Sequence, residues 1–204
     1  MTSNVFGKPV TEGSRLERAI MARNDPNADN KRDEALAYVR RQKAQWGTGV
    51  STLCFFYNAT GETLFFDGEH SWFGRIYGSY PLIVQNGQWG AFLHVKRTAA
   101  ASGSMGYVLY RVKGTNDAGY LSSLIGWDNP WNKAGHSNKA FCDVYEDGKI
   151  VDNNEIYNAF STSSRIATVR KMGMWITATI DTINSPLFEA YFNLEEMMLK
   201  LELA

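Results

Sequence analysis

The chain has little of several features that would point to a particular class of protein. Its 204 residues include only two cysteines, Cys54 and Cys142, which lie in strand-like runs and are predicted to be buried thiols. Basic and acidic residues both number 21, and this zero net charge argues against a general nucleic-acid binder. No apolar run approaches the roughly 20 residues needed to cross a bilayer. The first residues lack a secretory signal, which predicts a cytoplasmic protein.

No catalytic or metal-binding motif appears in the sequence. The three histidines, His70, His94 and His136, do not have metal-ligand spacing, and Cys-x-x-Cys is absent. There is no nucleophile-elbow pattern, and Gly103-x-x-Gly106 lacks the Lys-Ser/Thr of a phosphate-binding loop. We expect His94 to be a half-buried strand histidine, and His70 and His136 to be solvated in loops. The sequence predicts a protein that is not an enzyme and carries no metal or cofactor.

What the chain does contain is a series of short apolar runs separated by turn residues. In the clearest case, Leu82–Val84 and Ala91–Val95 flank Gln85-Asn86-Gly87-Gln88. Asn-Gly between apolar runs is the strongest short-range signal of a β-hairpin, because both residues tolerate positive φ. We therefore expect these two runs to pair with each other, and a further strand to start at Tyr107.

Other strands are expected where β-branched and aromatic residues lie between turn signals. These runs are residues 51–57, 62–66, 72–77, 120–127, 140–146 and 174–180. Residues 187–194 suit a strand that pairs with residues 174–180, or a helix that starts after Ser185-Pro186. The regular turn signals, without alternating helices, predict a mainly β protein, an antiparallel β-sandwich. Residues 155–160 suit one helical turn or a short strand, and residues 195–204 suit a short C-terminal helix. The sandwich domain would span residues 48–204, after an arm and helical segment in residues 1–47.

The first 47 residues carry the signals of one or two helices. Thr11 or Ser14 can cap a first helix, which Pro26 must end. Asp29 or Asn30 can cap a second helix. That helix has three apolar residues on one face and a glycine suited to its C-cap, namely Ala35, Tyr38, Val39 and Gly47.

One aromatic cluster suggests a ligand site. Trp127-Asp128-Asn129-Pro130-Trp131-Asn132 places two indoles and three short polar side chains around a proline bend. Aromatic faces beside Asn and Asp suit a sugar ring or a choline head group, because they offer a stacking surface and hydrogen-bond partners. The alternative is that Trp127 is a core residue and that Trp131 packs against its own loop.

Longer blocks of the chain resemble the plant jasmonate-induced proteins of about this size. The blocks are Tyr57-Asn-Ala-Thr-Gly61, Gln85-Asn-Gly-Gln-Trp-Gly-Ala-Phe-Leu-His-Val95, Ala100-Ala-Ser-Gly103, Gly106-Tyr-Val-Leu-Tyr-Arg111 and Trp127-Asp-Asn-Pro-Trp-Asn132. The resemblance runs from Asn4-Val-Phe-Gly through most of the chain. It implies a plant protein that accumulates in stress or defence signalling, without an assigned biochemical activity.

A weaker resemblance extends to the β-sandwich of actinoporins and related fungal lectins. It rests on the order of an Asn-x-x-Gly turn, a Ser-Gly-x-x-Gly loop, a Pro-aromatic bend and Val-Tyr-Glu-Asp-Gly. It implies that five residues lie near the lipid head-group pocket of that fold: Met105, Pro130, Trp131, Tyr157 and Phe160. Actinoporins enter membranes through an apolar amphipathic N-terminal helix, whereas residues 14–45 here are strongly charged, so pore formation is not the leading expectation.

Three functions follow as hypotheses. The leading one is a non-enzymatic binding protein of plant stress response that recognises a carbohydrate or lipid head group at a rim from Trp127 to Trp131, including Asn129. The second is an interaction or storage-type protein without a small ligand, which forms a homo-oligomer through helices at residues 30–46 and 195–204. The third is a membrane-active, pore-forming-like protein. An enzyme would need a convergent set of His, Asp or Ser, for example around His94.

Overall fold

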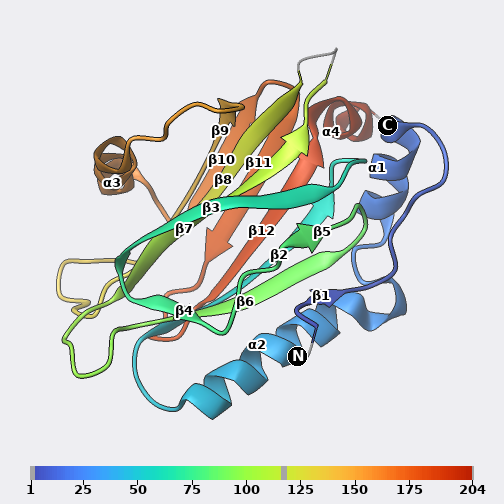
Figure 1. Ribbon diagram of the computed structural model, residues 1–204. Coiled ribbons are helices and arrows are strands. Elements are labelled where there is room, and N and C mark those ends of the chain that lie inside the picture. Colours follow the sequence, from blue (N-terminus) through green and yellow to red (C-terminus); the bar gives the residue numbers. More distant parts are fainter. Residues whose placement is uncertain (1–2, 116–118, 204) are drawn as a thin grey trace.

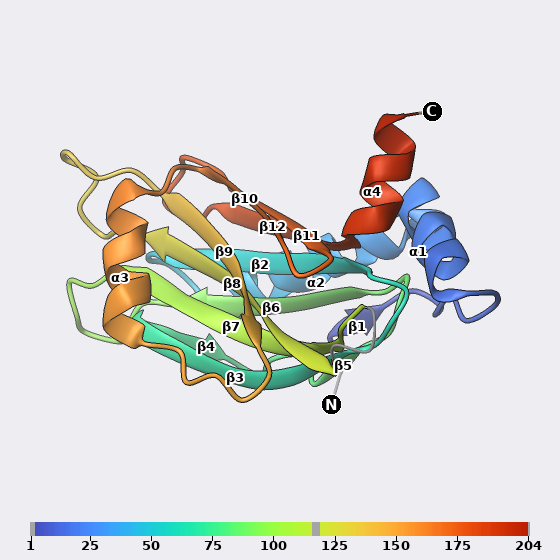
Figure 2. The same ribbon diagram turned by 90° about the horizontal axis from the view of Figure 1, so that it is seen from above.

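Two β-sheets face each other in this computed structural model, which describes residues 3–115 and 119–203 (Figures 1 and 2). The strands of the first sheet are β1 (Val5–Phe6), β2 (Ser51–Ala59), β4 (Arg75–Tyr77), β6 (Trp89–Val95), β10 (Ile166–Lys171), β11 (Met174–Ile180) and β12 (Leu187–Leu194). They run in the order β1-β6-β2-β12-β11-β10, and β4 also pairs with β6. The prediction of a mainly β sandwich is confirmed.

The second sheet covers the opposite side of the interior. Its strands are β3 (Leu64–Phe73), β5 (Ile83–Val84), β7 (Ser104–Lys113), β8 (Tyr120–Asn129) and β9 (Lys139–Glu146), in the order β5-β3-β7-β8-β9. Neighbouring strands of the sandwich are antiparallel except β12 and β2, which are parallel, with Phe188 opposite Cys54. The sandwich is thus antiparallel as predicted except at this pair, where β12 returns to the sheet beside a strand far from it in sequence.

The core between the sheets is rich in aromatic rings. Phe56 of the first sheet lies 4.8 Å from Tyr110 of the second, centroid to centroid, and Phe92 lies 5.4 Å from Trp127 in the same way. Such cross-sheet pairs bury large apolar areas and fix the distance between the sheets. Cys54 and Cys142 are both buried free thiols, as predicted.

Helices α1 (Arg15–Asn24) and α2 (Lys31–Trp46) lie against the first sheet, joined by a 3₁₀ turn (Ala28–Asn30). Ser14 caps α1 through a capping box, since its Oγ accepts from Glu17 N and Glu17 Oε2 accepts from Ser14 N. Gly47 ends α2 at φ 103°, as predicted for a C-cap. Ala35, Tyr38 and Val39 of α2 are buried against the sheet. The domain boundary at residue 47 stays a prediction.

The remaining helices are α3 (Asn153–Thr162) and α4 (Glu195–Glu202). Residues 155–160 therefore take the helical alternative, and Asp152 caps α3 by accepting from Asn154 N at 2.8 Å. Figure 2 shows α3 at one end of the sandwich and α4 at the other. In the described part of the chain, no helix is both long enough and apolar enough to cross a membrane.

The hairpin expected at Asn86-Gly87 is wrong. β5 pairs with β3 in the second sheet, whereas β6 pairs with β2 in the first. A type I′ hairpin needs positive φ at both central residues, but only Gly87 has it, at 85°. Asn86 is buried instead, and its side-chain amide donates to main-chain oxygens of the N-terminal segment. The turn thus carries the chain from one sheet to the other.

Two other strand predictions need correction. β3 is one long strand where a loop was expected at residues 67–70, because irregularities in its pairing after Phe66 and Ser71 absorb the turn residues. His70 therefore lies in a strand. β10 was not expected. It is an edge strand whose exposed and half-buried residues alternate, and it ends in two adjacent charged residues, Arg170 and Lys171.

Candidate functional site

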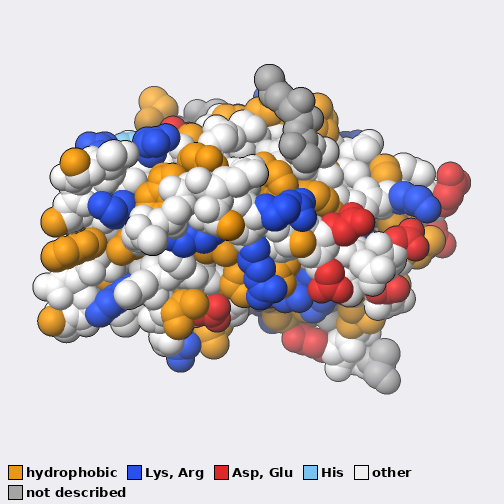
Figure 3. All heavy atoms as spheres, turned by 90° about the horizontal axis from the view of Figure 1, so that it is seen from below, with side chains coloured by type: hydrophobic (Ala, Val, Ile, Leu, Met, Phe, Trp, Pro, Cys, Tyr) orange, Lys and Arg blue, Asp and Glu red, His pale blue; other side chains and the backbone are white. Residues whose placement is uncertain are grey.

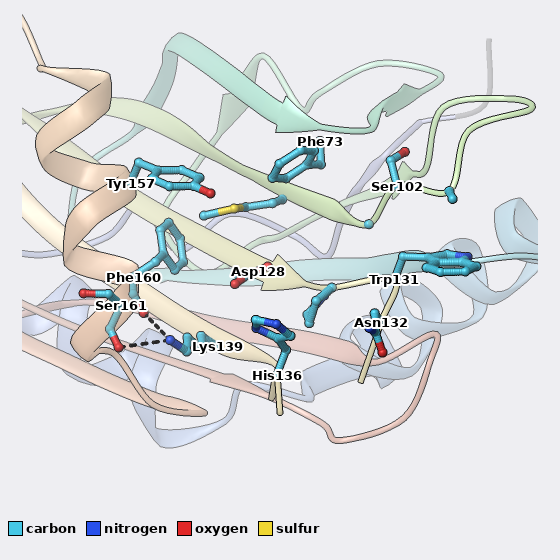
Figure 4. Close-up of a pocket in the computed structure, with 14 residues that line it drawn as sticks. Phe73, Ser102, Asp128, Trp131, Asn132, His136, Lys139, Tyr157, Phe160 and Ser161 are labelled. Carbon is cyan, nitrogen blue, oxygen red and sulfur yellow. Dashed lines mark hydrogen bonds between the residues drawn. The ribbon is translucent and has the colours of Figure 1, made fainter. Parts of the chain in front are cut away.

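A pocket of about 420 Å³ opens at the end of the sandwich where β8 ends, beside α3 (Figure 4). Its apolar lining comes from the end of β3, from β7, from the loop after β8 and from α3, and consists of Phe73, Met105, Pro130, Trp131, Tyr157 and Phe160. Segments that are distant in sequence therefore converge on one cavity, as is usual for a small-molecule site.

The aromatic rings of the pocket divide between its mouth and its inner wall. Trp131 is 54% exposed, and Phe73 and Tyr157 are each 44% exposed, whereas Phe160 is buried. Exposed rings carry a cost in water that contact with a ligand or a surface removes. The mouth thus offers π faces to an apolar or cationic group.

Asp128 supplies a negative charge to this pocket. Burial raises the pKa of Asp128 to about 6, although the positive charges of Lys139, Lys133 and His136 oppose the rise. The carboxylate is therefore mostly ionised near neutral pH and becomes neutral in mild acid. An aromatic cavity with a partly buried carboxylate suits a cationic ligand.

Two polar groups in the lining differ in how far the protein already satisfies them. Lys139 Nζ donates to the main-chain oxygens of Phe160 at 2.7 Å and Ser161 at 3.1 Å, at the C-terminal end of α3 (Figure 4). The buried Ser102 Oγ has no hydrogen-bond partner in the described part of the chain. Lys139 therefore contributes mainly charge to the pocket, whereas the Ser102 hydroxyl is enclosed by protein atoms.

The bend that carries Trp131 is fixed by a polar network. Asn129 Nδ2 donates to two main-chain oxygens at 3.0 and 3.1 Å, and Asn129 Oδ1 accepts from Lys133 Nζ at 2.6 Å. Lys133 Nζ also donates to Asn138. On the other side of the bend, a Cβ on Gly103 would lie 2.4 Å from Asn129 O, so only glycine permits this approach. The network holds the indole at the mouth of the pocket.

The structure brings together five of the seven residues that the sequence suggested as a site: Met105, Pro130, Trp131, Tyr157 and Phe160. Trp127 and Asn129 do not line the pocket, since both are fully buried. Side chains alternate along β8, so Trp127 and Asn129 point inward while Asp128 points to the pocket. The predicted rim is corrected accordingly. A ligand-binding role for the other five residues stays a prediction.

Several pocket residues were missed as site residues. The alternation of β8 could have singled out Asp128, which the sequence analysis placed only within the aromatic cluster. Phe73 reaches the pocket because it pairs with Met105 across β3 and β7. This pairing cannot be predicted from the local sequence around either residue. His136 is exposed in its loop as expected, but lines the cavity together with Lys139.

His94 forms a second polar cluster, which lies inside the sandwich. Its Nδ1 lies 2.8 Å from Ser104 Oγ and its Nε2 lies 3.0 Å from Ser71 Oγ. Further hydrogen bonds join Ser104 to Thr52 and Ser71 to Glu69. Histidine between hydroxyls and a carboxylate occurs in catalytic sites. Here His94 is fully buried, not half-buried as expected, and it does not line the pocket beside Trp131. Burial lowers the pKa of His94 to about 3, so the neutral ring bridges the two sheets.

Among the described residues, no group of three His, Cys, Asp or Glu side chains could hold a metal ion. The pocket itself offers aromatic rings, the hydroxyls of Tyr157 and Ser161, the amide of Asn132 and the charges of Asp128 and Lys139.

A family model described as Nakanori-like protein matches residues 3–195. The chain belongs to this Nakanori-like family. It is 33% identical over 185 residues to the 23 kDa jasmonate-induced protein of Hordeum vulgare. The aligned region covers 83% of this chain and 87% of that relative. The expected resemblance to the jasmonate-induced proteins is thereby confirmed.

A solved structure shares the fold of this Nakanori-like chain. The crystal structure of the lipid binding protein Nakanori superposes with a TM-score of 0.84 at 23% sequence identity. The match covers 93% of this chain and 99% of the Nakanori chain. The Xerocomus chrysenteron lectin XCL has a TM-score of 0.47 and 13% identity, and covers 72% of this chain and 100% of its own.

Proposed function

We propose that this protein binds a lipid head group in the pocket beside Trp131, as a non-enzymatic binding protein of plant stress or defence. The observation that carries the proposal is the set of exposed rings of Phe73, Trp131 and Tyr157 around a cavity that contains Asp128. A quaternary ammonium over an aromatic face gains about 0.5–2 kcal/mol, and a carboxylate adds Coulombic attraction. Choline head groups present this cation.

A carbohydrate is the second candidate for the same pocket. Sugar hydroxyls need several directed hydrogen-bond partners. Apart from the enclosed Ser102, the polar side chains of the lining are Asp128, Asn132, His136, Lys139 and Ser161, and Lys139 already donates to two main-chain oxygens. The mostly apolar wall favours the head group. Two relatives support the broader proposal, since Nakanori is described as lipid binding and the barley relative is named for its induction by jasmonate.

Replacing Trp131 by alanine is expected to weaken binding to phosphatidylcholine vesicles about tenfold, because the mouth loses its most exposed ring. Vesicle flotation measures the loss. Free phosphocholine is expected to compete with the vesicles, and simple sugars are not. If only sugars compete with the vesicles, the ligand of the pocket is a carbohydrate and not a lipid head group. Binding that survives the substitution would remove the site.

The matched control is Tyr120→Ala. Tyr120 is also a large exposed ring, at 41%, but it lies at the other end of β8. This variant is expected to bind like the wild type. If the wild type binds neither vesicles nor glycans, an interaction or storage role without a small ligand takes the place of this proposal.

Dye trapped in the vesicles is expected to stay inside, because binding needs no release of the N-terminal helices. Trp89 Nε1 donates to Pro26 O at 2.7 Å, and Tyr57 OH donates to Ala22 O at 2.7 Å. Arg32 makes a bidentate pair with Glu189, at 2.9 and 2.8 Å. Dye release would favour the pore-forming alternative.

Binding of a choline head group is expected to weaken as the pH falls through about 6, where Asp128 becomes protonated. The carboxylate attracts the ammonium only when ionised, so affinity is full above this pKa and falls by up to about tenfold per pH unit below it. Flotation across this range measures the effect. Asp128→Asn is expected to bind weakly at every pH. A wild-type profile that stays flat would contradict the role of Asp128.

A further inference from the structure

A group of basic side chains lies beside the pocket but outside it. We call this group the basic collar, which consists of Lys43 on α2, Arg75 on β4, and Lys96 and Arg97 after β6. Lys43 Nζ donates to Gly49 O at 2.8 Å, and a Cβ on Gly49 would lie 3.0 Å from Lys96. Arg75 pairs with Val95, the residue before Lys96. Three elements therefore bring their cations to one region.

Two segments connect the collar to the pocket. The loop after β6 begins with Lys96 and Arg97, and the same loop lines the pocket at residues 101–103. The end of β3 supplies Phe73 to the mouth, and Arg75 follows two residues later. A surface that approaches the mouth therefore also approaches the collar.

The collar has no acidic partner among the described residues. The six ion pairs that the structure shows there all use other cations. The sequence contains no Asp or Glu in residues 35–61 or 70–116. Because the whole chain has zero net charge, the acidic residues are concentrated elsewhere. Most of the acidic side chains visible in Figure 3 lie on its right, the side of α1 and α4 in Figure 2, whereas α3 and the pocket lie on the left. The collar is thus an uncompensated local positive charge.

We propose that the basic collar binds an anionic phospholipid surface and so brings the mouth of the pocket onto the bilayer. The inference rests on the proposed function of the pocket and adds the charge of the membrane to it. Lys and Arg within a Debye length of an anionic bilayer are attracted to it, and aromatic rings settle at the head-group level. A nucleic acid would also attract the collar, but the exposed rings of Trp131 and Tyr157 on the same end favour a bilayer.

The test compares vesicles of phosphatidylcholine alone with vesicles in which about one third of the lipid is phosphatidylserine. The anionic vesicles are expected to bind the wild type at least about tenfold more tightly, and added salt is expected to remove this gain. Arg75→Gln/Arg97→Gln is expected to lose most of the gain, because both side chains are exposed and belong to the collar. Arg111→Gln/Lys113→Gln removes the same charge from the far end of β7 and is expected to keep the gain.

The outcomes separate the collar from the pocket. If phosphatidylserine adds nothing, or if both double variants lose the gain equally, the collar proposal is overturned while the pocket stands on the Trp131→Ala result. If the gain depends on the collar but Trp131→Ala binds like the wild type, the collar stands and the pocket does not. Tighter binding to single-stranded DNA than to anionic vesicles at the same salt would also overturn the lipid assignment.

Discussion

Acid is expected to destabilise the fold through His94, by about 3 kcal/mol at pH 4 relative to neutral pH. The folded protein holds the pKa of His94 at about 3, whereas an unfolded histidine has a pKa near 6.5. Between these two values the unfolded chain binds a proton that the folded one does not. The stability that the neutral ring contributes is therefore full above about pH 6.5 and is lost at about 1.4 kcal/mol per pH unit as the pH falls towards 3.

Urea unfolding of the wild type and of His94→Gln at several pH values tests this expectation. At neutral pH the variant is expected to be less stable by about 1–3 kcal/mol, because Ser71 and Ser104 lose well-placed partners. Its loss of stability in acid is expected to be smaller than that of the wild type by about 3 kcal/mol. His136→Gln is the control, since this exposed histidine is solvated in both states. Parallel acid profiles for His94→Gln and the wild type would refute the account.

Individual strands could be predicted from the sequence because a strand with one buried face has a local signature. Residues 174–180 form β11 with the predicted bounds, since alternating burial and β-branched residues are both present there. Pairing between strands is not local. The Asn86-Gly87 turn has the composition of a hairpin, but the buried amide of Asn86 and its bonds to the N-terminal segment decide its geometry. Only the assembled sandwich contains that information.

The same distinction explains the pocket. The cluster around Trp131 was visible because indoles, a proline and short polar residues are adjacent in sequence. Met105, Tyr157 and Phe160 lie on other elements, and only the weaker resemblance to the sandwich of actinoporins and fungal lectins suggested them. Lys139 was missed because its place depends on the pairing of β8 with β9, where it stands opposite Asp128. A charge pattern across paired strands cannot be read before the pairing is known.

Asn58→Leu is expected to destabilise the protein by about 4 kcal/mol, although it replaces a polar core residue by an apolar one of similar size. Asn58 is fully buried, and its Nδ2 donates to Glu62 O and Val84 O at 2.8 Å each. Its Oδ1 accepts from Thr60 N at 3.1 Å and from Thr60 Oγ1 at 2.8 Å. The substitution removes all four bonds and takes their partner from Val84 O and Thr60 N, although Thr60 Oγ1 still donates to Glu62 O at 3.0 Å. The turn after β2 and the crossover between the sheets both lose their anchor.

Asn58→Asp separates hydrogen bonding from shape, because the two side chains are nearly isosteric. The aspartate keeps the acceptor for Thr60. In place of the Asn58 amide it presents an oxygen, which cannot donate, to Glu62 O and Val84 O, so we expect it to lower the free energy of unfolding at least as much as leucine does. Asn154→Leu, on the exposed side of α3, is expected to change the free energy of unfolding by less than about 0.5 kcal/mol. Urea denaturation measures all three. A stable Asn58→Asp variant would show that packing, and not the four hydrogen bonds of this amide, joins the turn to the crossover.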